Sequence, residues 1–165
     1  MEKYEYGGQN TLTYDKLPGF KNLVVWQKAS DMSALVNEAV KHFGHGYFKL
    51  IDQMRGATTS VTANIAEGYG NATLGNYVRY CLIARGSLHE LGSYLQYCER
   101  WNLIQREPLE KILALYSDVT FLLDRLIQSL QKKGKEGTWD RQFWIKEDQE
   151  EYVINLTSEE TGDTE

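Results

Sequence analysis

Apolar residues recur every three or four positions along most of the chain, in four stretches separated by glycine, asparagine or proline. This spacing is typical of an amphipathic α-helix, in which such positions share one face. It predicts helices over residues 21–43, 47–67, 74–101 and 108–133. In the third helix the expected core positions form an unbroken heptad stripe: Tyr77, Cys81, Ala84, Leu88, Leu91, Leu95 and Cys98. The pattern predicts an all-α fold, an antiparallel up-down-up-down four-helix bundle.

Residues with special backbone preferences mark the boundaries of these helices. Gly68 follows the second helix, where a left-handed residue commonly ends an α-helix. Pro108 opens the fourth helix, because the first helical position does not need the N–H that proline lacks. We therefore divide the chain into an extended N-terminal arm (residues 1–19), the four-helix bundle (20–133) and a C-terminal extension (134–165).

The C-terminal extension combines aromatic residues with an excess of acids. Residues 138–146 contain two tryptophans and a phenylalanine, which are costly to leave in water. We expect this segment to be ordered in part, as a short hairpin or an extended strap across the bundle. The alternative is a disordered acidic tail, which the composition favours from Thr157 onward.

The net charge of −5 is divided unevenly along the chain. Residues 146–165 hold one base and eight acids, a net of −7, whereas residues 1–145 hold seventeen bases and fifteen acids, a net of +2. The folded part is thus mildly basic and the tail strongly acidic. No apolar run approaches the ~20 residues of a membrane span, and the polar first ten residues lack a signal-peptide core. We expect a cytoplasmic protein.

The sequence contains no recognisable catalytic or metal-binding pattern. His42 and His45 stand three apart near a helix end, but no third ligand accompanies them, and a helix cap is the simpler interpretation. No phosphate-binding loop or nucleophile motif occurs. Cys81 and Cys98 fall on one predicted helix ~25 Å apart, too far to pair with each other. Both occupy apolar positions, so we expect buried, reduced thiols. We therefore expect a protein that is not an enzyme and holds no cofactor or metal.

Polar residues form a row beside the apolar stripe on each of two predicted helices. The rows are Ser60, Asn64 and Glu67 on the second helix and Ser87, Glu90 and Tyr94 on the third. We predict that the rows face each other as a structural polar seam that fixes the register of the bundle, since buried polar groups need partners. The alternative is a pocket for a small ligand.

Basic residues are spread through the second, third and fourth helices, which is usual for a solvated surface. Our candidates for contacts with nucleic-acid phosphates are Arg55, Arg79, Arg85 and Arg100, and tyrosines near them could stack on bases. A single copy with a net charge near +2 would attract nucleic acid weakly. Several copies in a ring would multiply that charge into a continuous field.

Three separated motifs carry a resemblance to a known family. They are Leu23-Val24-Val25-Trp26-Gln27-Lys28-Ala29, the stretch from Gln53 to Gly68, and Ile83-Ala84-Arg85-Gly86-Ser87-Leu88-His89-Glu90-Leu91. Over about residues 20–131 the chain resembles the four-helix-bundle family of ribosomal RNA intervening-sequence proteins, which is related to the accessory variability determinant proteins of diversity-generating retroelements. The resemblance implies a bundle that assembles as a homopentameric, barrel-like ring. For the retroelement branch it implies binding to a reverse transcriptase and to RNA or RNA/DNA hybrids.

Three functions therefore stand as hypotheses. The first is a non-enzymatic, pentameric accessory protein that binds RNA or RNA/DNA and acts with a reverse transcriptase in a diversity-generating retroelement. The second is a protein-interaction scaffold in which the aromatic strap docks a partner and RNA is not a ligand. The third is an intracellular small-ligand binder that uses Asn64, Glu67 and Glu90.

Overall fold

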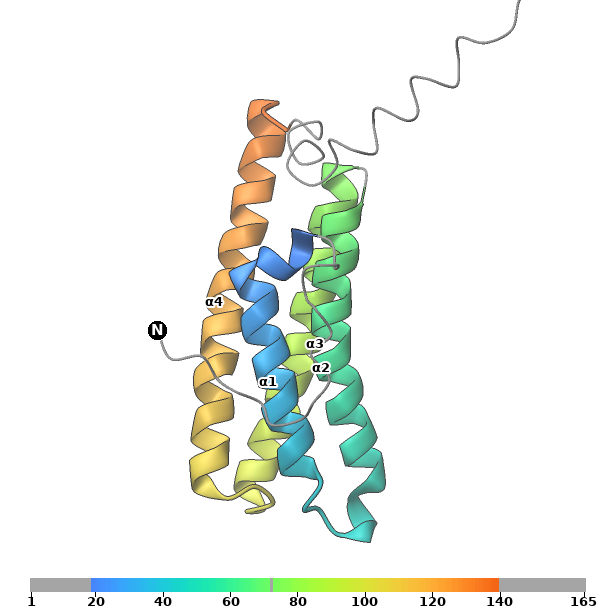
Figure 1. The fold of residues 1–165 in the computed structure, drawn as a ribbon, viewed down its shortest axis with the longest axis vertical. Helices are drawn as coiled ribbons and strands as arrows, with labels where there is room; N and C mark the ends of the chain where they lie inside the picture. The colour runs from blue at the N-terminus through green and yellow to red at the C-terminus, as the bar shows by residue number, and fades with distance from the viewer. Residues whose placement is uncertain (1–18, 72, 140–165) are drawn as a thin grey trace, which may run out of the picture.

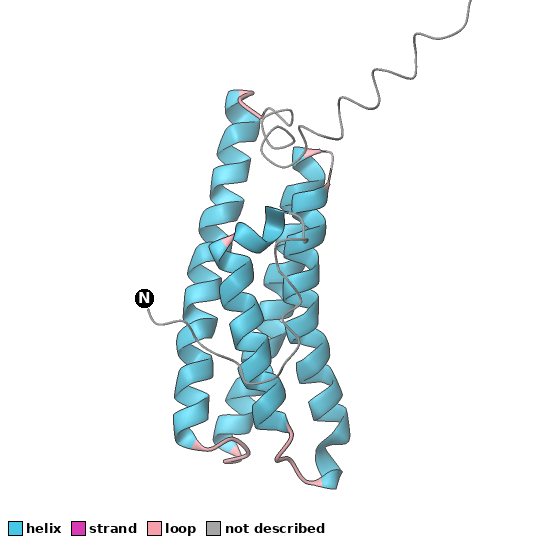
Figure 2. Ribbon diagram, in the orientation of Figure 1, coloured by secondary structure: helices cyan, strands magenta, loops and turns pink. Residues whose placement is uncertain are grey.

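Four long α-helices pack side by side in the computed structural model, which describes residues 19–71 and 73–139 (Figure 1). The helices are α1 (Val24–Val40), α2 (Phe48–Gly70), α3 (Leu74–Arg100) and α4 (Arg106–Glu136). Short 3₁₀ turns, η2 (Gly19–Asn22) and η3 (His45–Tyr47), precede α1 and α2, and the described residues include no strand (Figure 2). Consecutive helices run antiparallel, and each packs against two neighbours. The predicted up-down-up-down bundle is confirmed.

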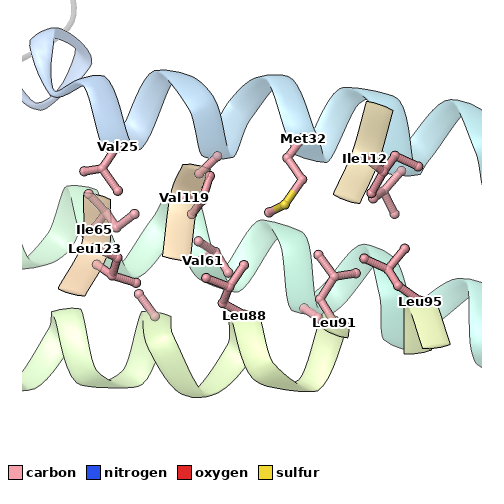
Figure 3. Close-up of a cluster of buried hydrophobic side chains, with 14 of the residues drawn as sticks. Val25, Met32, Val61, Ile65, Leu88, Leu91, Leu95, Ile112, Val119 and Leu123 are labelled. Atoms are coloured by element: carbon pink, nitrogen blue, oxygen red, sulfur yellow. The ribbon is translucent and has the colours of Figure 1, made fainter. Parts of the chain in front are cut away.

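The core is a continuous apolar column to which all four helices contribute (Figure 3). Met32 of α1, Val61 of α2, Leu88 of α3 and Val119 of α4 are each fully buried in it. Each such side chain contributes roughly 1.5–3 kcal/mol by leaving water. All seven positions that the heptad stripe predicts on α3 are buried.

The first helix is shorter than the predicted span of residues 21–43. The chain before it forms η2, and the residues after Val40 bond to carbonyls three positions back instead of four. The Lys41 N–H donates to the Glu38 carbonyl at 3.2 Å, and the Phe43 N–H donates to the Val40 carbonyl at 3.2 Å. Such bonds tighten the last turn of a helix. The apolar rhythm thus continues for one turn beyond the α-helix itself.

The predicted end of the second helix at Gly68 is wrong. α2 continues to Gly70 and ends at Asn71, whose backbone is extended (φ −78°, ψ 146°). Gly68 is buried within the helix, and a Cβ there would lie 2.8 Å from Tyr77 Cδ2 and 3.0 Å from Tyr80 Cβ on α3. The glycine therefore permits two helices to approach closely and is not needed for a left-handed turn.

The fourth helix extends past both of its predicted ends. Pro108 is its third residue rather than its first, and the N–H groups of the whole first turn have no partner within the helix. At the other end α4 continues beyond Lys133 to Glu136, where Gly137 adopts φ +64°. The Thr138 N–H then donates to the Lys133 carbonyl at 3.1 Å. This pairing is the Schellman arrangement that closes many helices.

Most of the predicted N-terminal arm and C-terminal extension lies outside the described residues. Of the arm, residues 1–19, only Gly19 is described, and the chain is described as far as Trp139 at the other end. The Trp139 ring packs against Tyr77, with the ring centroids 6.2 Å apart. The first aromatic residue of the predicted strap therefore contacts the bundle near the α2–α3 turn.

Candidate functional site

Hydrogen bonds join α2 to α3 at three levels along one side of the bundle. We call these pairs the polar ladder: Gln53–Tyr94, Ser60–Ser87 and Glu67–Tyr80. The oxygen–oxygen distances are 3.3 Å in the first pair and 2.8 Å in the second. In the third, the Glu67 carboxylate accepts a hydrogen bond from the Tyr80 hydroxyl and so raises its pKa. Successive pairs are seven residues apart on both helices.

Asn64 and Glu90, the other two members of the predicted seam, bond within their own helices. Asn64 Nδ2 donates to the Ser60 carbonyl at 2.7 Å. The Tyr94 hydroxyl donates to Glu90 Oε1 at 3.0 Å, and this bond raises the pKa of Tyr94. The amide and the carboxylate are therefore each bonded to a residue of their own helix. The geometry favours a seam that sets helix register over a small-ligand pocket.

The four arginines predicted to contact phosphates do not form one surface. Arg79 and Arg100 lie ~31 Å apart along α3 at 1.5 Å per residue. Arg85 Nη1 lies 3.3 Å from Asp124 Oδ1 on α4, so a carboxylate already accompanies it. Arg55, Arg79 and Arg100 are exposed. None of these three forms an ion pair with another described residue.

Bases gather instead where α2 turns into α3 and α4 ends. These segments meet in space, because a Cβ at Gly134 of α4 would lie 3.0 Å from Leu74 Cδ2 at the start of α3. We call residues 19–27, 67–83 and 123–139 the basic end. Its sequence holds six bases and three acids, a net of +3. The bases are Lys21, Arg79, Arg125, Lys132, Lys133 and Lys135.

The opposite end of the bundle is neutral. This far end, residues 38–54 and 95–111, holds five bases and five acids. Three of its bases, Lys41, Arg106 and Lys111, pair with carboxylates three or four residues away along the chain. The middle of the bundle holds three bases and three acids over residues 28–37, 55–66, 84–94 and 112–122. The sequence analysis did not predict this concentration of positive charge, because the bases of the basic end come from segments that are distant in the sequence. The three lysines near the end of α4 were the one sign of it in the sequence.

Aromatic residues also distinguish the two ends. At the basic end Tyr77 is 3% exposed and contacts both Tyr69 and Trp139 edge to face. Its hydroxyl has no hydrogen-bond partner among the described residues, and burial raises its pKa. At the far end Tyr97 and Trp101 are 43% and 60% exposed, with ring centroids 6.0 Å apart. The aromatic rings therefore pack against one another at the basic end, whereas Tyr97 and Trp101 face solvent at the far end.

Comparison with known proteins identifies the family. The model of the family described as 23S rRNA-intervening sequence protein matches residues 21–125. The chain belongs to this family. A solved structure from Bacteroides thetaiotaomicron VPI-5482, described as a protein with unknown function from the S23 ribosomal protein family, shares its fold. That chain is 22% identical, with a TM-score of 0.58, and the match covers 63% of this chain and 98% of the other. No curated protein matches the sequence.

The resemblance to ribosomal RNA intervening-sequence proteins is thus confirmed, and the relation to retroelement proteins stays a prediction. In this intervening-sequence family member, no three His, Cys, Asp or Glu side chains of the described residues are grouped to hold a metal ion. Burial raises the pKa of Cys81 to about 12 and that of Cys98 to about 11. Thiols with such values are poor nucleophiles at neutral pH. None of the described helices is both long and apolar enough to span a membrane.

Proposed function

We propose that this intervening-sequence family member is a non-enzymatic accessory protein that binds RNA or RNA/DNA hybrids through the basic end. The observation that carries the proposal is the net charge of +3 at that end, in a bundle whose middle and far end are neutral. A surface of this kind recognises backbone phosphates. The family description names an intervening sequence of 23S rRNA, which makes RNA the first polymer to test.

Assembly is the second part of the proposal. One copy offers too few phosphate contacts for tight binding at physiological salt. A homopentameric ring, the arrangement that the resemblance implies, would combine five basic ends into one positive field. The protein partner in this proposal is the reverse transcriptase of a diversity-generating retroelement, in the cytoplasm. Light scattering of the purified protein tests the ring directly, since a pentamer has five times the mass of one chain.

A titration of labelled, structured RNA with the full-length protein at several salt concentrations tests RNA binding. The affinity should fall steeply with salt, because each phosphate contact displaces condensed counterions. Replacing Lys132 and Lys135 by Gln should reduce the log–log salt slope by about one for each phosphate that is no longer neutralised. The matched control replaces Lys41 and Lys111 at the far end by Gln and should leave the slope unchanged.

Single arginine variants refine the same measurement. Arg79→Gln should weaken RNA binding, since Arg79 lies at the basic end and is exposed. Arg85→Gln should weaken it less, because Asp124 already pairs with that guanidinium. An absence of binding even at ~50 mM salt, where electrostatic attraction is strong, would remove RNA as a direct ligand.

Exposed apolar side chains on α4 favour a protein-interaction scaffold as the second candidate. Phe121 is 65% and Leu113 37% exposed on this helix. Trp139, in contrast, packs on its own bundle, so the first ring of the predicted strap does not project toward a partner. Binding of reverse transcriptase that is insensitive to salt and is lost in Phe121→Ala would favour this function over RNA binding.

A further inference from the structure

The acidic end of the chain follows directly after the basic end of the bundle. Trp139, the last described residue, packs against Tyr77 and belongs to the apolar cluster that closes this end. Residues 146–165 carry one base and eight acids, a net of −7. Six residues separate Trp139 from this acidic segment, a span of roughly 25 Å at most. The acids therefore begin within reach of the bases.

The bases at this end are accessible to such a segment. Arg79, Arg125, Lys132 and Lys135 are all exposed. Lys132 lies 3.8 Å from Glu136 in an exposed pair within one helix, which contributes little. Arg79, Arg125 and Lys135 form no ion pair with a described residue. A polyanion could approach all four without breaking a buried interaction.

We propose that the acidic segment, residues 146–165, docks on the basic end of its own bundle and competes there with nucleic acid. Opposite charges of +3 and −7 select this occupant. The anchor at Trp139 keeps the segment near the site at an effective concentration on the order of millimolar. The far end is neutral and offers no comparable attraction. The contact itself does not require nucleic acid, whereas its regulatory consequence rests on the proposed function.

Zero-length carbodiimide cross-linking of the full-length protein tests the contact without RNA. The reagent joins a lysine amine to a carboxylate that touches it, and mass spectrometry locates the products. We expect Lys132 and Lys135 to be joined to acids of residues 147–165 about tenfold more often than Lys41 and Lys49 at the far end. These products should disappear at ~500 mM salt, where exposed charges are screened. A mixture of ¹⁵N-labelled and unlabelled protein should show products within one chain.

A full-length variant in which the net charge of the segment falls from −7 to −3 is the matched control for the tether. It carries Glu147→Gln, Asp148→Asn, Glu150→Gln and Glu151→Gln, so its length and aromatic residues are unchanged. Cross-links from the remaining acids to Lys132 should fall several-fold, because the attraction is reduced while the anchor stays. Products that persist in this variant and at high salt would show that proximity alone joins the groups, and would overturn the proposal. Equal labelling of far-end lysines, or products only between chains, would also overturn it.

The same variant tests the competition. It should bind structured RNA about tenfold more tightly than the natural sequence at low salt, and the difference should shrink as salt rises. Equal RNA affinities beside the expected cross-links would overturn the competition while leaving the contact established. If neither protein binds RNA at any salt, the proposed function fails, and the cross-links still decide whether the segment docks.

Discussion

The two ends of this bundle use the same kinds of residue in different ways. At the basic end Tyr77 and Trp139 pack on each other, and the bases outnumber the acids by three. At the far end Tyr97 and Trp101 face solvent and the charges balance. The apolar column between them includes buried residues of both ends. The comparison teaches that the apolar core can continue unchanged along the bundle while the surface charge and the exposure of the aromatic rings differ between its two ends.

The prediction with the largest expected effect compares two buried thiols, one toward each end of the bundle. Burial raises the pKa of Cys81, toward the basic end, to about 12 and that of Cys98, at the far end, to about 11, from an ordinary value of 9.0. The unfolded chain releases these protons first, so the contribution of both thiols to stability is complete below pH 9 and is lost as the pH rises to about 11 for Cys98 and about 12 for Cys81. At pH 10 we expect a loss of about 1.4 kcal/mol for each thiol, or about 3 kcal/mol together.

Urea unfolding at pH 8 and pH 10, followed by circular dichroism, measures this loss. Cys81→Ala and Cys98→Ala should each remove about half of the pH-dependent part, and by equal amounts if the interior is the same at both ends. The pH dependence of stability that remains in the double variant measures the contribution of all other titrating groups. A pH dependence as steep in the double variant as in the natural protein would contradict the prediction.

The second prediction concerns helix approach at the basic end. Gly68→Ala should destabilise the protein by about 2 kcal/mol, because the new methyl group would press on Tyr77 and on Tyr80 Cβ. The matched control is Gly56→Ala on the same helix, where a Cβ meets nothing within 4 Å. That change should stabilise by up to ~1 kcal/mol through helix propensity. Thermal unfolding measures the melting temperature of both variants. Melting temperatures that shift in the same direction would contradict the interpretation that Gly68 permits close helix approach.

The third prediction sharpens the contrast between the aromatic pairs. Trp139→Ala should cost roughly 1.5 kcal/mol, since the ring leaves a partly buried position against Tyr77. Trp101→Ala should change stability by less than ~0.5 kcal/mol, because 60% of that side chain already faces water. Urea unfolding of the two full-length variants measures both values. Equal losses would mean that Trp139 does not contribute to closing the basic end.

The prediction with the smallest expected effect compares the residues that terminate α3 and α4. Gly137, directly after α4, has φ +64°, and Asn102, two residues after the end of α3, has φ +51°. The Leu103 N–H donates to the Cys98 carbonyl at 2.9 Å, so both ends have the same capping pattern. Asn102→Gly should stabilise by about 0.5 kcal/mol and Gly137→Ala should destabilise by about 1 kcal/mol, as left-handed backbone favours glycine. Melting temperatures that move in the opposite directions would contradict this.

The sequence predicts the fold well where one signal acts without competition. The seven core positions of α3 could be read directly because its heptad stripe is continuous and its length leaves no alternative element. Gly68 could not be interpreted in the same way. Glycine serves both left-handed turns and close helix approach, and only the packing of Tyr77 against it decides between them.

The candidate site was less predictable, because it depends on how distant segments meet. Arg85 looks available on α3 until the register of α4 places Asp124 beside it. The basic end likewise becomes visible only when the start of α3 and the end of α4 are brought together. The polar rows could be foreseen from their spacing. The pairing of Gln53 with Tyr94 and of Tyr80 with Glu67 could not.

The polar ladder also constrains how bundles of this kind can vary in length. Its pairs repeat every seven residues on α2 and on α3, so seven residues added to each helix would keep the existing rows in register and lengthen the helix pair by ~10.5 Å. An insertion of two or five residues would instead turn one row of partners away from the other. A hairpin that keeps the ladder can therefore grow or shrink only in whole heptads, which makes its length a stepwise rather than a continuous property.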